Sequence, residues 1–272
     1  MLTFLFDLDG VIYRDHDPLP GAAATVAALR DAGHLVLFAT NNATRRRAEF
    51  IERLAGMGIA AGPDQVGTSA SATAQYLLGL PTPPTSALVI GSEALQAELR
   101  EVGIRSILAE DDAETREQPD CVVVSLDRQF TYAKLAAAQR AVLSGAALVV
   151  TNRDPQFPGA DRLWPGAGSI VAAVEAACRL SATAIGKPGP LLYQALLRAN
   201  GAEPSRAIAI GDSLQTDIAA AAAMSMPSVL VLTGVSRRSD VQAAPAKPSL
   251  IIETLSELLT ADLDALFAPH SV

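Results

Sequence analysis

The first ten residues place the tightest constraint on the fold. Leu2 to Phe6 is an almost wholly apolar run that leads into Asp7-Leu8-Asp9-Gly10. Such a run is typical of a strand buried on both faces at the centre of a parallel sheet. Residues two apart in a strand share a face, so Asp7 and Asp9 can point the same way beside a glycine turn. Neighbouring carboxylates repel, so the pair predicts a bound cation or split ionisation states, and ordinary acidic turn residues are the alternative.

The same alternation of apolar strands and amphipathic helices continues along the chain. The connecting loops are short, which is typical of right-handed βαβ units. Further strands are predicted at 34–39, 87–91, 121–124, 147–151, 207–210 and 228–232, and residues 250–252 form a short apolar piece. Helices are predicted at 22–32, 69–78, 92–102, 132–143, 191–199, 217–223 and 254–267, and a further one is expected to be capped by Thr44 and to end at Gly56. The sequence therefore predicts the α/β fold class.

A proline-rich segment divides this pattern in two. Residues 79–85 read Gly-Leu-Pro-Thr-Pro-Pro-Thr, a composition that stiffens the backbone and excludes a regular element. The strand and helix alternation restarts after it with enough apolar surface for a second core. We therefore predict a core domain formed by residues 1–81 and 183–272, and an inserted α/β domain formed by residues 82–182.

Composition excludes several classes of function. The net charge is -8 and the only dense basic run is Arg45 to Arg47, which argues against a nucleic-acid partner. No apolar run approaches the ~20 residues of a membrane span, and the N-terminus lacks the basic region of a signal peptide. Cys121 and Cys178 have no short-range partner, and the histidines show no zinc spacing. We expect a soluble, cytoplasmic protein with neither membrane nor nucleic-acid partner.

Polar residues gather just after predicted core strands or in the loops of the core. Ligand sites of open parallel sheets form beyond the carboxyl ends of the strands. Acidic groups from two strands can hold Mg²⁺, and a hydroxyl, backbone N–H groups and an ammonium can hold a phosphate. The residues concerned are Asp7, Asp9, Thr40, Asn41, Lys187, Asp212 and Asp217. Together they predict a metal and phosphate site.

These motifs, in this order, resemble the haloacid dehalogenase (HAD) superfamily. The resemblance is to its phosphatases with a large inserted cap, the group of NagD-like, 4-nitrophenyl phosphate, glycerol phosphate and pyridoxal phosphate phosphatases. It implies a HAD-type Rossmann-like core with a parallel sheet, a substrate-specificity cap and phosphoric monoester hydrolysis. Its marks in the core are the segments 6–11, 40–42, 185–188 and 211–212 with Asp217, and in the insert 68–69, 89–91, 126–127, 130–132, 151–154 and 165–168.

The resemblance also implies catalytic roles. Asp7 would be the nucleophile that forms an aspartyl-phosphate, and Asp9 would protonate the leaving alcohol and then activate water. Thr40 and the Asn41 backbone would bind the phosphoryl group. Lys187 would neutralise charge on the phosphoryl oxygens and on Asp7.

The implied cofactor is Mg²⁺. By resemblance, the side chains of Asp7 and Asp212 and the backbone carbonyl of Asp9 would hold it. Asp217 would stand behind them and fix water or Lys187. Three residues depart from the pattern of relatives, namely Ser213, Gln215 and Ser225. None is a required ligand, although Ser225 stands where glycine is usual and puts the local turn geometry in question.

The inserted domain is expected to select the substrate, a small phosphorylated metabolite. Candidate substrate-binding residues in its long loop are Asn152, Arg153, Asp154, Phe157 and Trp164. An arginine there suits a second anionic group, and the aromatic residues suit a ring. Two alternatives are that Trp164 packs in the core of the insert and that Arg153 only pairs with Asp154. Phe157 stands where some pyridoxal phosphate phosphatases have a histidine, which disfavours that substrate.

Two other functions stay open at this point. A hydrolytic dehalogenase would use Asp7 without metal, and would leave Asp9, Asp212 and Asp217 with nothing to serve. A catalytically inactive protein that binds a phosphorylated metabolite would keep the site and lose the chemistry. A homodimer is an open alternative, because dimers through the inserted domain occur among the relatives that the chain resembles.

Overall fold

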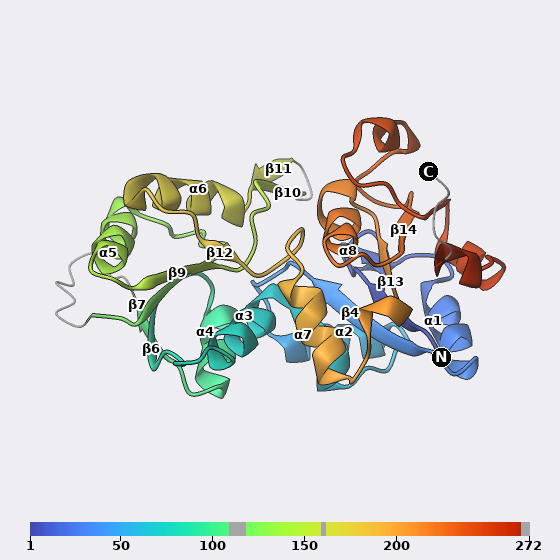
Figure 1. Cartoon of the computed structure of the whole chain (residues 1–272), viewed down its shortest axis with the longest axis horizontal. Coiled ribbons are helices and arrows are strands. Elements are labelled where there is room, and N and C mark those ends of the chain that lie inside the picture. Colours follow the sequence, from blue (N-terminus) through green and yellow to red (C-terminus); the bar gives the residue numbers. More distant parts are fainter. Residues whose placement is uncertain (109–117, 159–161, 268–272) are drawn as a thin grey trace. The chain divides into compact units, whose positions relative to one another are not determined.

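The computed structural model describes residues 1–108, 118–158 and 162–267, which form two compact units (Figure 1). The first unit consists of Met1–Thr40, Arg47–Gly67 and Lys187–Val272. The second unit consists of Asn41–Arg46 and Thr68–Gly186. None of the helices within the described ranges combines the length and the apolar character that crossing a bilayer requires.

The first unit is built on a six-stranded sheet with the order β15-β14-β13-β1-β4-β5. Its strands are β1 (Thr3–Phe6), β4 (Leu35–Thr40), β5 (Val66–Thr68), β13 (Ala207–Gly211), β14 (Ser228–Val231) and β15 (Leu250–Ile252). The central strand β1 runs parallel to both neighbours, with Phe6 opposite Ile210 and Phe38. This register brings the ends of β1, β4 and β13 to one edge of the sheet. A short antiparallel hairpin, β2 (Tyr13–Arg14) and β3 (Asp17–Pro18), follows β1.

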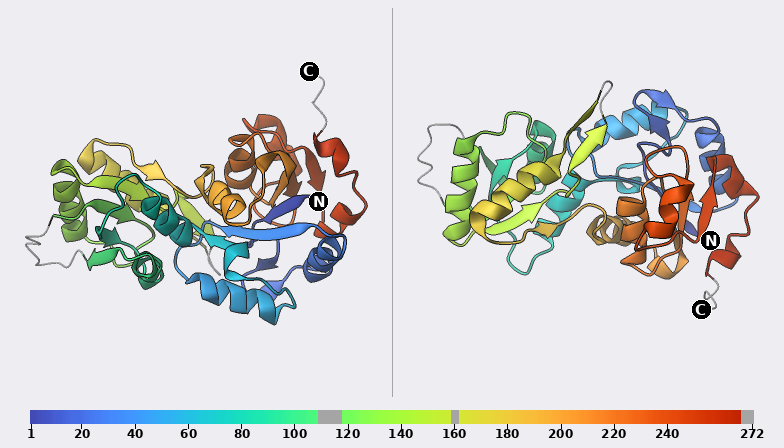
Figure 2. Two further views of the ribbon diagram at one scale, coloured as in Figure 1. Left: turned by 60° about the horizontal axis from the view of Figure 1, so that its bottom comes forward. Right: turned by 90° about the horizontal axis from the view of Figure 1, so that it is seen from above.

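Helices cover both faces of this sheet. Figure 2 (left) shows α1 (Ala22–Asp31) and α2 (Arg47–Gly56) on one side, with α7 (Leu191–Ala199) and α8 (Ala219–Ala222) on the other. Alternate residues of a strand face opposite sides. Val229 and Val231 accordingly join the core cluster that includes α1 and α2, whereas Leu230 packs with Leu214 and Ile218. Every residue of β1 is buried, which confirms the prediction of a strand buried on both faces.

The second unit contains a five-stranded parallel sheet with the order β12-β9-β8-β6-β7. The strands are β6 (Ser86–Ile90), β7 (Arg105–Leu108), β8 (Cys121–Val124), β9 (Ala147–Val150) and β12 (Thr183–Ala184). The helices are α3 (Ser69–Leu78), α4 (Glu93–Glu101), α5 (Tyr132–Leu143) and α6 (Ala167–Cys178), and β10 (Gln156–Pro158) and β11 (Leu163–Pro165) form a hairpin. The sheet packs with α5 and α6 in a core of its own. The α/β fold class is confirmed.

The second unit starts earlier than the proline-rich segment predicted. Helix α3 packs on α4 and therefore belongs with the inserted unit, although it precedes residue 82. Residues 41–46 also belong to this unit. That the insert acts as a substrate-selecting cap stays a prediction.

Local structure differs from the prediction at three helices. Thr44 does not cap α2, which starts at Arg47, because the Thr44 N–H and hydroxyl both donate to Asn42 Oδ1 in a turn. The helix predicted at 217–223 is a π-helical turn (Leu214–Ile218) followed by the one-turn α8. In place of the helix predicted at 254–267, the chain forms two 3₁₀ segments, Leu255–Leu259 and Asp264–Phe267. The pattern thus predicted where these elements lie, but not their helical type or exact ends.

One sequence departure has a visible structural counterpart. Ser225 has a φ of 53°, in the left-handed region that favours glycine. The turn after α8 therefore keeps the backbone conformation that a glycine would adopt, although a serine occupies the position.

Candidate active site

Three buried carboxylates meet at one edge of the first unit's sheet. Asp7 directly follows β1, and Asp212 directly follows β13, the neighbouring strand. Asp217 lies in the π-helical turn that comes next in the chain. One carboxylate oxygen from each of the three residues lies within 4.8 Å of the other two. The parallel register of β1 and β13 brings together acids that are far apart in the sequence.

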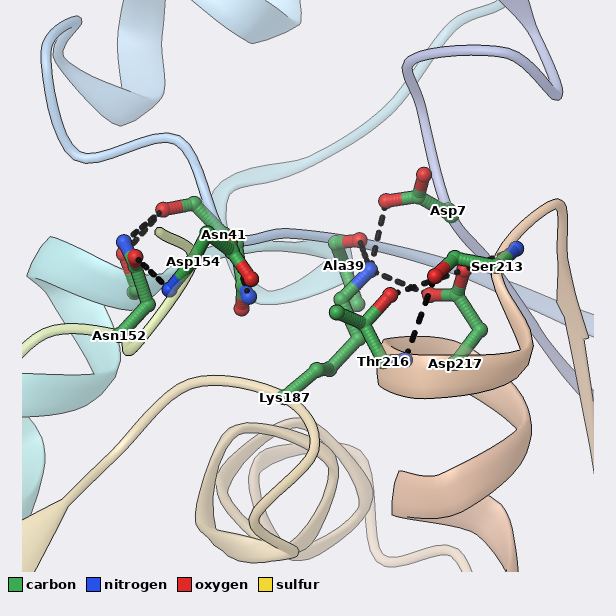
Figure 3. A network of polar contacts seen from close by, with 10 residues as sticks. Asp7, Ala39, Asn41, Asn152, Asp154, Lys187, Ser213, Thr216 and Asp217 are labelled. Atoms are coloured by element: carbon green, nitrogen blue, oxygen red, sulfur yellow. Dashed lines mark hydrogen bonds and ion pairs between the residues drawn. The ribbon is translucent and has the colours of Figure 1, made fainter. Parts of the chain in front are cut away.

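Lys187 joins two of these acids. Its Nζ donates to Asp7 Oδ1 at 2.6 Å, to Asp217 Oδ1 at 2.6 Å and to the carbonyl oxygen of Ala39 at 3.1 Å (Figure 3). The lysine is only 2% exposed. A buried ammonium is costly without charged partners, and the two carboxylates supply them. The structure thus brings together Asp7, Lys187, Asp212 and Asp217, all of which the sequence singled out.

The backbone around the acids holds their side chains in place. Asp217 Oδ2 accepts the Ser213 N–H at 3.1 Å, and Asp212 Oδ2 accepts the Val235 N–H at 2.8 Å. Gly10 and Gly234 both face the Asp212 carboxylate, and a Cβ atom at either position would overlap it. Glycine is therefore required there because the backbone approaches a carboxylate closely.

The electrostatics of the cluster favour a cation. Burial raises the pKa of Asp7 well above its usual value, with Asp217 and Asp212 adding to the rise and Lys187 opposing it. Burial and the neighbouring Asp217 raise the pKa of Asp212 to about 7. Burial lowers the pKa of Lys187, but Asp217 and Asp7 outweigh it and leave that pKa raised. When all three carboxylates are ionised they outnumber the one ammonium, so a bound cation would favour their ionised forms, and oxygen ligands of this kind fit Mg²⁺.

Two further core candidates, Thr40 and Asp9, lie within two residues of Ala39 and Asp7, respectively. Thr40 is buried at the end of β4, one residue after the carbonyl that Lys187 contacts. Asp9 is exposed, and its carboxylate is not part of the three-carboxylate group. Its predicted contribution to metal binding is through the backbone carbonyl, which stays a prediction.

Asn41, the next candidate, is held inside the second unit. Its carbonyl oxygen accepts the Ser69 hydroxyl at 2.6 Å and Asn152 Nδ2 at 2.9 Å. Its own Nδ2 donates to Asp154 Oδ2 at 2.9 Å (Figure 3). Two of the candidate substrate-binding residues therefore contact Asn41.

Arg153 has a different partner from the one weighed in the sequence. Its guanidinium binds both carboxylate oxygens of Glu175, at 2.8 and 2.7 Å, and donates to the Ala182 carbonyl at 3.0 Å. Pairing with Asp154 alone is therefore wrong. The reason is that α6 places Glu175 beside Arg153, a contact that local spacing in the sequence does not reveal.

Phe157 and Trp164 lie opposite each other on the hairpin of β10 and β11. The Arg128 guanidinium lies 5.7 Å from the centre of the Phe157 ring, and that of Arg162 lies 4.5 Å from the centre of the Trp164 ring. Trp164 is 42% exposed and does not belong to the core of the second unit. The alternative that it packs in that core is wrong, because the hairpin carries it on the surface.

Two residues in or beside these networks were given no role by the sequence. Ser69 donates to the Asn41 carbonyl, and although it lies in one of the segments that carry the family resemblance, no spacing links it to Asn41 before the chain folds. Tyr193, fully buried on α7, is close enough for Lys187 and Asp217 to influence its pKa, which burial raises. Its position soon after the predicted Lys187 loop, on a helix with an apolar face, was the available signal.

Comparisons with known proteins agree with the arrangement of the core. A family model described as haloacid dehalogenase-like hydrolase matches residues 4–105. A second model, described as HAD-hydrolase-like, matches residues 184–258. The two matches cover the segments that carry Asp7, Thr40, Lys187, Asp212 and Asp217.

Whole-chain relatives are similar over nearly the full length. An acid sugar phosphatase of Staphylococcus aureus is 35% identical over 257 residues, which are 94% of this chain and 96% of the relative. A p-nitrophenyl phosphatase from Archaeoglobus fulgidus has a TM-score of 0.87 at 28% identity, covering 95% of this chain and 98% of that one. A glycerol phosphate phosphatase from Mycobacterium tuberculosis, solved in complex with magnesium, has a TM-score of 0.84 at 34% identity, covering 94% of this chain and 75% of that one.

Proposed function

Because the chain belongs to the haloacid dehalogenase-like hydrolase family, we propose that it is a Mg²⁺-dependent phosphatase acting through an aspartyl-phosphate. Its substrates are small-molecule phosphomonoesters, the class named by its relatives. The observation that carries the proposal is the group of buried Asp7, Asp212 and Asp217 around Lys187. A nucleophile, a counter-charge and spare oxygen ligands are what phosphoryl transfer requires.

The chemistry follows from the two acids after β1. Asp7 attacks phosphorus, a bond forms between its carboxylate oxygen and phosphorus, and the bond to the substrate alcohol breaks. Asp9 gives its proton to the leaving alcohol. Asp9 then accepts a proton from water as that water attacks phosphorus, which releases phosphate and restores Asp7. The exposure of Asp9 leaves it accessible for both proton transfers.

The other core residues stabilise charge and orient the phosphoryl group. Lys187 neutralises Asp7 and the phosphoryl oxygens, and its contact with Asp217 keeps its ammonium in place. The Thr40 hydroxyl and the Asn41 N–H bind the phosphoryl oxygens. Mg²⁺ would be held by the Asp7 and Asp212 carboxylates with the Asp9 carbonyl, and when bound it would offset charge on the phosphoryl group.

The proposal also covers the substrate, the cellular location and the oligomeric state. The second unit selects small phosphorylated metabolites, and the half-buried Phe157 and the exposed Trp164, each beside an arginine, are its candidate substrate contacts. A cytoplasmic location and a homodimer belong to the proposal as well. A metal-free dehalogenase is not favoured, because Lys187 pairs with Asp7 and Asp217 and the buried Asp212 would be left without a cation.

Release of phosphate from 4-nitrophenyl phosphate tests the function directly. We expect Mg²⁺-dependent turnover that EDTA abolishes and added Mg²⁺ restores, because a bound cation would favour the ionised forms of the buried carboxylates. Turnover is measured by 4-nitrophenol absorbance, with and without EDTA. Equal rates in the two conditions would contradict the metal-dependent mechanism, and no turnover of any phosphomonoester would contradict the phosphatase proposal.

The close approach of Gly234 to Asp212 makes a second prediction. Gly234→Ala places a Cβ atom against the Asp212 carboxylate, so we expect Mg²⁺ affinity to fall about 10- to 100-fold, the range typical when the support of a metal ligand is disturbed. Isothermal titration calorimetry measures the affinity. Gly56→Ala is the matched control, because its added Cβ meets nothing within 4 Å beyond its chain neighbours and the backbone of its own helix. Equal affinities for the two variants would contradict the prediction.

A further inference from the structure

We propose that Asn152 and Asp154 are positioning residues that hold Asn41 for phosphoryl binding, an inference that rests on the proposed function. They are predicted by sequence as substrate contacts. Their polar atoms are instead directed to Asn41, at 2.9 Å in each case. Asn41 directly follows Thr40 in the chain, so its backbone adjoins the proposed phosphoryl-binding hydroxyl.

Both ends of Asn41 are restrained. Its carbonyl oxygen accepts two hydrogen bonds, from Ser69 and Asn152, which orient the peptide group that follows Asn41. Its side-chain amide is held by Asp154. The preceding residue, Thr40, is the last residue of β4 and is restrained by the sheet. Few backbone rotations stay open to the Asn41 N–H, and fixed donors bind a phosphoryl group without reorganisation.

Residues 151–154 form the turn that supplies these contacts, and this turn is itself restrained by hydrogen bonds and packing. The Asp154 N–H donates to Asn152 Oδ1 at 3.1 Å, and Arg153 is anchored to Glu175. A Cβ atom at Gly168 would overlap the Arg153 carbonyl. The turn is therefore a packed support for Asn41.

The same turn also contacts the residue before Lys187. The Gly186 N–H donates to the Thr151 carbonyl at 2.7 Å. A Cβ atom at Gly186 would overlap the Asn41 side chain and the Thr151 carbonyl. Residues 151–154 thus contact Asn41, which follows Thr40 in the chain, and Gly186, which precedes Lys187. The hydrogen bonds of the Asn152 and Asp154 side chains to Asn41 therefore lie within the second unit.

Alanine substitutions separate positioning from substrate contact. We expect Asp154→Ala and Asn152→Ala to lower kcat/KM about 10- to 100-fold, because misplacing a binding group by about 1 Å can cost 10²-fold. A positioning role predicts the same loss for phosphomonoesters with different alcohol groups. It also predicts weaker binding of inorganic phosphate, measured by calorimetry. Asp154→Asn keeps an acceptor oxygen for Asn41 and should stay within about 3-fold of wild type in both measurements.

Asp120→Ala is the matched control, because it removes an aspartate of the same unit that accepts hydrogen bonds from Thr85 and Ser86 and touches neither Asn41 nor residues 151–154. It should lower stability in thermal unfolding and leave phosphate affinity unchanged. Losses that depend on the alcohol group, with unchanged phosphate binding, would overturn the proposal and assign the two residues to the substrate. Phosphate binding is measured without turnover, so a wild type that binds phosphate and lacks phosphatase activity would contradict the proposed function alone. If Asp154→Ala fails to fold, Asn152→Ala decides the question.

Discussion

Asp7→Asn is expected to reduce phosphatase turnover by at least about 10⁴-fold, in line with the loss of a catalytic nucleophile in other enzymes. The amide keeps the shape of the side chain but cannot attack phosphorus as a carboxylate does. The Lys187 ammonium would also lose one of its two charged partners, leaving Asp217. Turnover of 4-nitrophenyl phosphate at saturating Mg²⁺ measures the effect.

Asp127→Asn is the matched control for that substitution. Asp127 pairs with Lys134 at 2.8 Å in the second unit, so its variant also removes the acid of a lysine–aspartate pair. We expect its turnover to stay close to that of wild type. An Asp7→Asn variant that retains more than about 1% of the activity would contradict a covalent aspartyl-phosphate.

Lys187→Met is expected to destabilise the protein by about 3–5 kcal/mol in EDTA, because breaking a buried ion pair leaves uncompensated charge. The ammonium lies between Asp7 and Asp217, and both acids would then be buried without it. We also expect kcat to fall about 10²- to 10³-fold, since a fixed positive group near the phosphoryl oxygens is lost. Urea unfolding and steady-state kinetics measure the two effects.

Lys134→Met serves as the control for Lys187→Met. It breaks the Lys134 pair with Asp127, in which the lysine side chain is 20% exposed, so we expect a smaller loss of stability and no loss of turnover. Equal losses in the free energy of unfolding for the two variants would contradict the prediction that Lys187, buried between two acids, contributes more to stability than Lys134.

The order of strands and helices was largely readable from the sequence. β1, β8 and β13 are short apolar runs, and such runs report burial directly because a strand between two layers of helices must be apolar on both faces. The helices at 69–78, 132–143 and 191–199 were predicted with the bounds that the structure has. Helix ends were less readable: α2 starts at Arg47 because Thr44 is used in a turn with Asn42.

The side-chain networks of the second unit were not readable from the sequence. Asn152, Arg153 and Asp154 are consecutive, yet the first and third bind Asn41 and the second binds Glu175. Their partners lie far away in the chain, and hydrogen bonds depend on distances and directions that exist only after the elements pack. Composition and spacing could therefore nominate these residues but not their partners.

The order of residues along the chain indicated most of the candidate catalytic residues, because parallel strands bring the residues at their C-terminal ends to one edge of a sheet. Asp7, Thr40 and Asp212 were singled out on that ground, and Lys187 because it lies between a glycine and a proline in a loop. Folding settled which polar atoms face each other: the buried Lys187 between Asp7 and Asp217, and Asn41 between Ser69, Asn152 and Asp154. These contacts join segments separated by many residues, and short-range patterns carry no information on such pairings.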